Sequence, residues 1–64
     1  MIVRAKVSAA SGDHYRVMVG ERISGLLPIM RVGDQLEPII FQPGDWVVAA
    51  FFGSLADGII LGRG

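Results

Sequence analysis

The sequence contains no cysteine and only one histidine, His14, among its 64 residues. Disulfide bonds, thiolate metal sites, a cysteine nucleophile and a site with several histidine ligands are therefore excluded. Charged residues are only 19% of the chain, and the six basic side chains balance the six acidic ones. A formal net charge of zero argues against a protein that binds nucleic acid by bulk neutralisation of phosphates.

The sequence also lacks an apolar stretch long enough to cross a bilayer as a helix. The longest uncharged run, Trp46 to Ala56, contains Gly53 and Ser54. The first residues alternate apolar and basic side chains, so they do not resemble the continuous apolar region of a signal peptide. We therefore expect a chain without a membrane span that is made in the cytoplasm and stays soluble or assembles there.

Apolar residues are abundant, at 52% of the chain. A domain of about 60 residues buries only ~60% of the surface that its unfolded chain exposes. Domains of this size are usually supported by disulfides, a metal ion or oligomerisation. The first support is excluded and nothing indicates the second, so we expect residues 1–64 to form one domain that self-associates.

Alternation of apolar and polar residues dominates the chain and predicts β-structure. The predicted strands cover about residues 2–9, 15–19, 22–27, 46–52 and 58–62. Turns are expected at Gly12 and Gly20, and a bulge or bend at Gly25. The segment Pro28–Pro43 holds all three prolines, and we expect it to be an ordered connection packed on the core, with a short helical turn or an extended piece at 39–41;.

Five short strands must close on themselves or pair with neighbours, because open sheet edges invite aggregation. The predicted fold is therefore a small all-β barrel of the oligonucleotide/oligosaccharide-binding (OB) type, whose third and fourth strands are joined by a longer connection. A small SH3-like barrel is the alternative.

The strand at 46–52 is apolar on both faces. Val47, Ala49 and Phe51 form one face, and the other face is formed by Trp46, Val48, Ala50 and Phe52. An exposed apolar row of this kind marks an interaction site. Two explanations stay open, since Pro28–Pro43 of the same chain could cover the row, or the row could be a subunit interface between copies of the chain.

Candidate chemistry is sparse. His14 lies beside Asp13 and near Ser11 in a turn, an arrangement typical of turn hydrogen bonding rather than catalysis;. The acidic residues have no spacing that suits acid–base chemistry, and the glycines do not form a phosphate-binding loop. We expect no catalytic residue, no cofactor and no metal, and hence no enzyme.

Single-stranded nucleic-acid binding is the alternative function, because OB barrels often stack bases on aromatic side chains within a basic groove. Tyr15, with Arg4, Lys6, Arg16 and Arg22 on the first three strands, would supply such a face. The simpler interpretation is that these cations keep an apolar barrel soluble, and we therefore do not expect nucleic acid as a partner.

The second half of the chain resembles a known family. Leu26-Leu27-Pro28 is followed by Pro43-Gly44-Asp45-Trp46-Val47-Val48-Ala49-Ala50-Phe51 and then by Gly58-Ile59-Ile60-Leu61-Gly62. This pattern resembles the OB-fold domain of phage tail-spike and baseplate assembly proteins, the baseplate protein V and type VI secretion spike family. The matching residues are Gly44, Asp45, Val47, Phe51, Gly58, Leu61 and Gly62.

The resemblance implies that Val47, Ala49 and Phe51 face the barrel interior and that Trp46, Val48, Ala50 and Phe52 form the oligomer interface. We expect Ile59 and Leu61 to complete the core. Gly44, Asp45, Gly58 and Gly62 are expected to form the turns of the family motif.

By the same resemblance the protein is a structural component of a phage or prophage tail, assembled in the host cytoplasm, located in the virion and usually trimeric. Its partners would be other tail or baseplate proteins. In that family a β-helical needle follows the last strand, whereas this sequence stops two residues after Gly62. We therefore expect a hub, spike-base or tail-tip role rather than membrane piercing.

Overall fold

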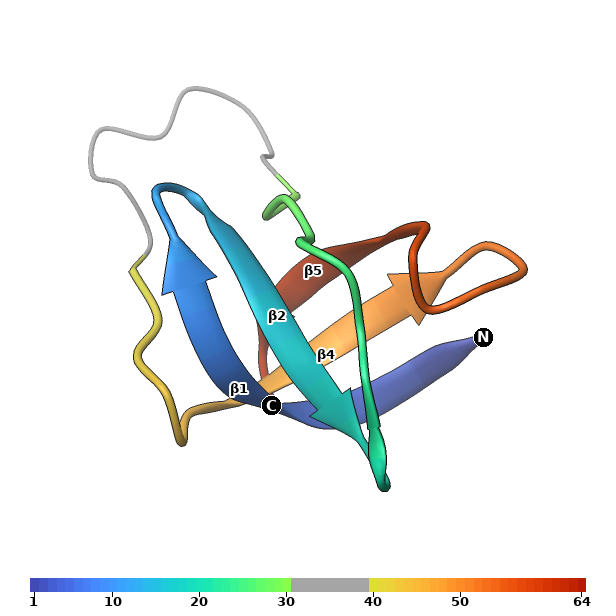
Figure 1. Cartoon of the computed structure of the whole chain (residues 1–64), viewed down its shortest axis with the longest axis horizontal. Helices are drawn as coiled ribbons and strands as arrows, with labels where there is room; N and C mark the ends of the chain where they lie inside the picture. The colour runs from blue at the N-terminus through green and yellow to red at the C-terminus, as the bar shows by residue number, and fades with distance from the viewer. Residues whose placement is uncertain (31–39) are drawn as a thin grey trace.

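A computed structural model describes residues 1–30 and 40–64 of the chain. The described residues form strands and no helix. The strands are β1 (Ile2–Ser11), β2 (His14–Val19), β3 (Arg22–Ile23), β4 (Trp46–Phe51) and β5 (Gly58–Arg63). All five join one antiparallel sheet in the order β3-β2-β1-β4-β5 (Figure 1). The prediction of a small all-β fold with five strands is confirmed.

The strand order is a Greek key followed by a hairpin. β1, β2 and β3 follow one another as a meander, and β4 returns to lie beside β1;. A parallel bridge then joins Ile29, after β3, to Ile60 in β5. Here the Met30 amide donates to the Ile60 carbonyl (2.7 Å) and the Ile60 amide donates to the Pro28 carbonyl (2.9 Å).

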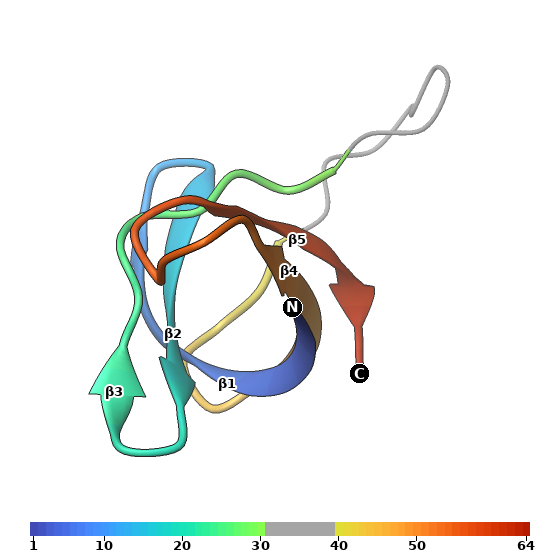
Figure 2. The ribbon, with the colours of Figure 1, turned by 90° about the vertical axis from the view of Figure 1, so that its right-hand side faces the viewer.

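This bridge brings the two ends of the sheet together. The strands curl around a common centre (Figure 2), although the sheet is not closed by a continuous ladder in the part of the chain that is described. A partly open Greek-key barrel is the OB-like arrangement. The observed strand order agrees with the OB-like prediction rather than with the SH3-like alternative.

β1 holds the sheet together because it pairs on both sides. Its first half, Ile2–Lys6, pairs with β4, and its second half pairs with β2. The register with β2 shifts between Val7 and Ala9, which marks a β-bulge. A bulge reverses the alternation beyond it, so Ala9 is exposed although strict period two would put it on the core face with Val7;.

β3 is shorter than expected, since residues 22–27 were predicted and only Arg22–Ile23 form the strand. The buried Ser24 explains the interruption, because its hydroxyl oxygen accepts the Val17 amide (3.0 Å) where a regular ladder would use a main-chain carbonyl. Pairing resumes at Leu27, which exchanges two main-chain hydrogen bonds with Tyr15 (2.8 and 3.0 Å). The bend expected at Gly25 lies in this interruption.

The core lies between the curled strands and is almost entirely apolar. Its buried side chains are Ala5, Val7, Tyr15, Val17, Leu27, Phe41, Val47, Ala49, Phe51 and Ile60. The proline-containing connection supplies Phe41 to the core and Ile29 to its edge, where Ile29 packs against the core cluster. The described ends of this connection therefore pack on the core. Of the extended piece expected at 39–41, Ile40 and Phe41 are described and belong to no strand, whereas residue 39 lies outside the described residues. Most of the segment in which a short helical turn was the alternative also lies outside them.

The prediction that Ile59 and Leu61 face the core is wrong. Ile60 is fully buried, whereas Ile59 and Leu61 are only half-buried and lie outside the core cluster. The cause is the pairing with β4, because Phe51 points inward and lies opposite Gly58. Directly paired residues of antiparallel strands share a face, so the next inward residue of β5 is Ile60, opposite Ala49;.

Candidate functional site

The outer face of β4 carries the apolar row that the sequence predicted. Val47, Ala49 and Phe51 are buried in the barrel, so the alternate residues point outward. Trp46 keeps 42% of its surface exposed, Phe52 keeps 62%, and Val48 and Ala50 are half-buried. The exposed indole does not support the alternative in which the chain's own Pro28–Pro43 segment buries it.

Neighbouring strands extend this row. Ala50 lies opposite Ile2 of β1 on one side and opposite Ile59 of β5 on the other. Ile2 is 69% exposed. Ile59, expected in the core, therefore belongs to the outer surface, where directly opposed side chains lie about 4.5–5.5 Å apart at Cβ.

Leu61 joins the same surface through a second bulge. Val48 pairs with Gly62 and Ala49 with Ile60, so Leu61 is the extra residue between them on β5;. We call the resulting surface the outer-face patch, and it comprises Ile2, Trp46, Val48, Ala50, Phe52, Ile59 and Leu61. Ile2 was not among the expected interface residues, although its alternation with Val3 signals an outward position, and Ile59 and Leu61 were expected in the core instead.

One end of the outer-face patch is basic. The guanidinium carbon of Arg4 lies 4.5 Å from the centroid of the Trp46 ring, and the ammonium nitrogen of Lys6 lies 5.3 Å from it. Both cations stand on β1 beside Trp46, since Lys6 is its direct cross-strand partner. Such cation–π contacts stabilise by about 0.5–1 kcal/mol each at an exposed site. The patch thus has an aliphatic end around Ile2 and Ala50 and a cationic, aromatic end around Trp46.

The turn before β4 positions Trp46. Gly44 has φ +99°, a conformation that side-chain-bearing residues rarely adopt, and Asp45 accepts the Gln42 amide through its carboxylate (2.9 Å);. The turn is bonded to β1 as well, because the Gly44 amide donates to the Val7 carbonyl and the Val7 amide to the Asp45 carbonyl, each at 2.8 Å. Gly44 and Asp45 are therefore turn residues, as the motif implied.

The two other motif glycines are not turn residues. Gly58 and Gly62 lie within β5. Gly58 faces the ring of Phe51, and a Cβ at this position would stand 2.6 Å from the Phe51 Cδ1 atom and 2.6 Å from the Ala50 carbonyl oxygen. Close packing of β4 on β5, rather than turn geometry, requires glycine here.

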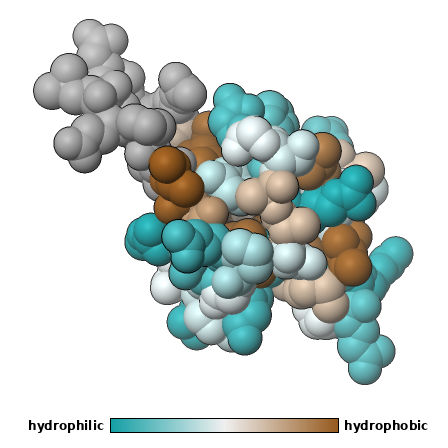
Figure 3. All heavy atoms as spheres, turned by 60° about the vertical axis from the view of Figure 1, so that its left-hand side comes forward, coloured by the Kyte–Doolittle hydropathy of each residue, from teal (hydrophilic) through white to brown (hydrophobic). Residues whose placement is uncertain are grey.

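The opposite side of the barrel does not offer the aromatic platform that base stacking needs. Tyr15 is only 2% exposed, its hydroxyl accepts the Phe41 amide (3.2 Å), and its ring meets the Phe41 ring edge-on with centroids 5.5 Å apart. The prediction that Tyr15 could stack on a base is therefore wrong. Figure 3, which brings the left-hand side of Figure 1 forward, shows separate hydrophobic areas among hydrophilic ones.

His14 has the local role expected of it. His14 is the first residue of β2, and its Nδ1 atom lies 2.8 Å from a carboxylate oxygen of Asp13 in the turn before that strand. Among residues 1–30 and 40–64, no three side chains of the metal-binding types gather where they could hold an ion. No helix in these ranges has the length and apolar character needed to cross a membrane.

The geometry thus presents one extended candidate surface, the outer-face patch, built from β1, β4 and β5. Comparison with known proteins adds no assignment to it. No protein-family model matches the chain, and no match is found among curated proteins or solved structures.

Proposed function

We propose that this chain is a non-enzymatic structural component of a phage or prophage tail or baseplate that self-associates through the outer-face patch. The observation that carries self-association is the exposure of Ile2, Trp46 and Phe52 on a barrel whose core is already filled. The tail assignment rests on the resemblance of residues 22–64 to the spike and baseplate family. The virion location and the other tail proteins as partners rest on that resemblance too.

The exposed aromatic surface sets the scale of the interaction. A buried aromatic side chain covers about 150–250 Å², so the exposed parts of Trp46 and Phe52 amount to roughly 200 Å². At ~25 cal/mol per Å², covering them would contribute about 5 kcal/mol. Association costs about 4–15 kcal/mol, so the aliphatic residues Ile2 and Ile59 must be covered as well for a stable complex.

We favour a trimer, which requires two different contact surfaces on each copy. Rings with three-fold symmetry use heterologous interfaces, in which a surface of one copy meets a different surface of the next. A second exposed apolar area is available at the β3 end of the sheet, where Ile23 is 55% and Leu26 is 41% exposed. We propose that the outer-face patch of one copy packs against Ile23 and Leu26 of its neighbour.

Light scattering after size-exclusion chromatography tests the proposal at micromolar concentration. Replacing Trp46 and Phe52 together with serine should convert the oligomer to monomer, because aromatic side chains that become buried in an interface often contribute about 2 kcal/mol or more each. Ile40, which is 65% exposed and lies outside both surfaces, supplies the control Ile40→Ser. A monomeric wild-type protein, or an oligomer that both variants leave unchanged, would refute self-association through this patch.

The variant Ile23→Ser distinguishes the ring from a two-fold dimer. It should weaken a ring in which the β3 end meets the patch, and it should leave a dimer built from two facing patches intact. Co-purification with neighbouring tail proteins expressed from the same operon tests the tail assignment separately.

Single-strand nucleic-acid binding is the second candidate, and one observation favours it. Arg4 and Lys6 beside the exposed indole of Trp46 combine cations with an aromatic face, which is the combination that single-strand binders use;. Trp46 is the only tryptophan of the chain, so its fluorescence reports directly on this place.

Titration with a mixed-sequence oligonucleotide at low salt should quench Trp46 if this candidate is correct. Binding should weaken as salt rises and should be lost in the variant Lys6→Ala but not in Arg16→Ala, whose arginine lies on β2;. Absence of quenching at low salt would eliminate the candidate.

A further inference from the structure

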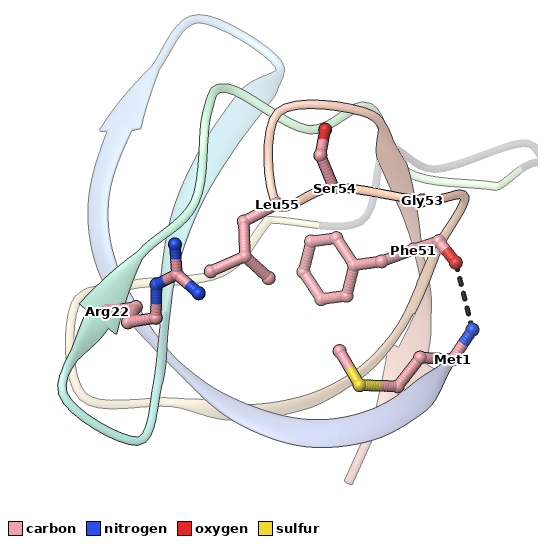
Figure 4. A pocket seen from close by; sticks show the side chains of 6 residues that line it. All are labelled: Met1, Arg22, Phe51, Gly53, Ser54 and Leu55. Carbon is pink, nitrogen blue, oxygen red and sulfur yellow. Dashed lines mark hydrogen bonds between the residues drawn. The ribbon is translucent and has the colours of Figure 1, made fainter.

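A hollow opens at one end of the barrel. It has a volume of about 470 Å³ and is lined by Met1, Arg22, Phe51, Gly53, Ser54 and Leu55 (Figure 4). These residues come from the chain start, β3, the end of β4 and the loop between β4 and β5. Sites for small ligands commonly measure about 300–1,000 Å³ and occur at the mouths of β-barrels.

The lining is apolar with one charged side chain. Phe51 is only 3% exposed and forms the floor, and Leu55 packs against the core. In Figure 4 the Arg22 guanidinium, the Leu55 side chain, the Phe51 ring and the Met1 side chain gather around the same space, whereas the Ser54 hydroxyl points away from the ring. A mainly apolar pocket with a small number of polar groups is the usual composition of a ligand site.

The walls of this hollow are held in place by main-chain hydrogen bonds. The Gly25 amide donates to the Leu55 carbonyl (2.9 Å), which ties the β4–β5 loop to the segment after β3. Met1 and Phe51 exchange two bonds, from the Phe51 amide to the Met1 carbonyl (2.7 Å) and from the Met1 ammonium to the Phe51 carbonyl (2.9 Å). A site that exists before binding does not need to be ordered by its ligand.

The charge of Arg22 is not neutralised within the described part of the chain. No carboxylate there lies within ion-pair distance of its guanidinium, and this includes Asp57 of the adjoining loop and the neighbouring Glu21. A guanidinium carries five N–H donors and pairs with a carboxylate through two parallel hydrogen bonds. Beside an apolar wall, such a group selects a ligand that combines a carboxylate with a hydrocarbon.

We propose that the mouth of the barrel binds an apolar carboxylate. Its carboxylate pairs with Arg22, and its hydrocarbon part lies on Phe51 and Leu55. A medium-chain acid and the C-terminal residue of a peptide that ends in leucine both present this chemistry. The site shares no residue with the outer-face patch, but Met1 and Phe51 adjoin Ile2 and Phe52 of that patch, and Arg22 adjoins Ile23 of the proposed second contact surface.

Chemical-shift titration of the amide resonances tests the site, with octanoate as the probe and octanamide as its neutral match. Octanoate at millimolar concentration should saturate shifts at Gly53, Ser54 and Leu55, and octanamide should bind at least about tenfold more weakly, as expected for loss of a charge-assisted hydrogen bond. A short peptide ending in leucine, with a free or an amidated terminus, provides the second arm. Tighter binding of the free peptide identifies a chain terminus as the ligand, and tighter binding of octanoate identifies a free acid.

The variant Arg22→Gln should remove the preference for the acid over the amide while its spectrum stays that of a folded protein. Arg16→Gln, which removes an equal charge from β2, should leave the preference unchanged. Equal binding of octanoate and octanamide to the wild-type protein, an unaltered preference in Arg22→Gln, or the absence of shifts at the β4–β5 loop would each overturn the proposal.

Discussion

Gly58 offers a sharp test of how β4 and β5 pack. It faces the barrel interior opposite Phe51, and a Cβ there would lie 2.6 Å from the Ala50 carbonyl oxygen and 2.6 Å from the Phe51 Cδ1 atom. The ring can turn, but the carbonyl belongs to the main chain of β4 and moves only if the strand moves. We therefore expect Gly58→Ala to destabilise the fold by about 1–3 kcal/mol, the usual cost of overpacking a core.

This cost is large for a domain of this size. At about 0.05–0.15 kcal/mol per residue, the free energy of unfolding of such a chain is roughly 3–10 kcal/mol. Gly62→Ala is the matched control, because Gly62 lies in the same strand, has no atom within 4 Å of an added Cβ and has no positive φ. That substitution should be neutral or stabilise by about 0.4–1 kcal/mol, since alanine restricts the unfolded chain.

Thermal unfolding followed by circular dichroism at one fixed protein concentration measures the difference between the two variants. Each kcal/mol shifts the Tm of a domain this small by about 4–8 °C, so Gly58→Ala should melt roughly 5–30 °C below Gly62→Ala. If Gly58→Ala melts at the same temperature as the control or above it, then the close approach of β5 to Phe51 is not a constraint. The explanation that the pairing of Phe51 with Gly58 turns Ile60 inward would then fail as well.

Three further predictions concern the hydrogen bonds of the core and the bridge that joins the two ends of the sheet. Tyr15→Phe removes the hydroxyl that accepts the Phe41 amide, and should lower the unfolding free energy in urea by about 1 kcal/mol;; an unchanged value would mean that this bond adds nothing. Ser24→Ala leaves the buried Val17 amide without an acceptor and should cost about 1–3 kcal/mol in the same assay;, and a neutral result would contradict the role given to that hydroxyl. In hydrogen exchange, the Ile60 amide should be protected, because it donates to the Pro28 carbonyl at the bridge that joins the two ends of the sheet;. Exchange as fast as in an unstructured peptide would show that the barrel is open at this bridge.

Local patterns in the sequence determined much of the architecture. The alternation in residues 2–7 and the continuous apolar run in residues 46–51 both predicted strands, and the structure has strands at both places. The glycine and aspartate at 44 and 45 signalled the turn before β4, because a residue at φ +99° is nearly always glycine;. Period two placed Trp46 and Phe52 on the same face of this strand, and the family resemblance chose that face as the outer one.

Other features depended on contacts between distant segments. Residues 59–61 are three consecutive apolar side chains, so no local pattern tells which of them faces inward, and the pairing of Phe51 with Gly58 selects Ile60. Tyr15 shares the inner face of β2 with the buried Val17, and the return of Phe41, a residue distant in sequence, covers its ring and binds its hydroxyl.

The sequence by itself determined that the chain is all-β, where most of its strands begin, and that β4 is apolar on both faces, since these depend on alternation and turn residues close together in the chain. The tertiary structure decided which residue of β5 faces inward and where β3 is interrupted by Ser24. It also decided that cations lie over the Trp46 ring and that Arg22, Leu55 and Phe51 line one hollow. Strand register and barrel curvature set these contacts, and both arise from interactions between residues far apart in sequence.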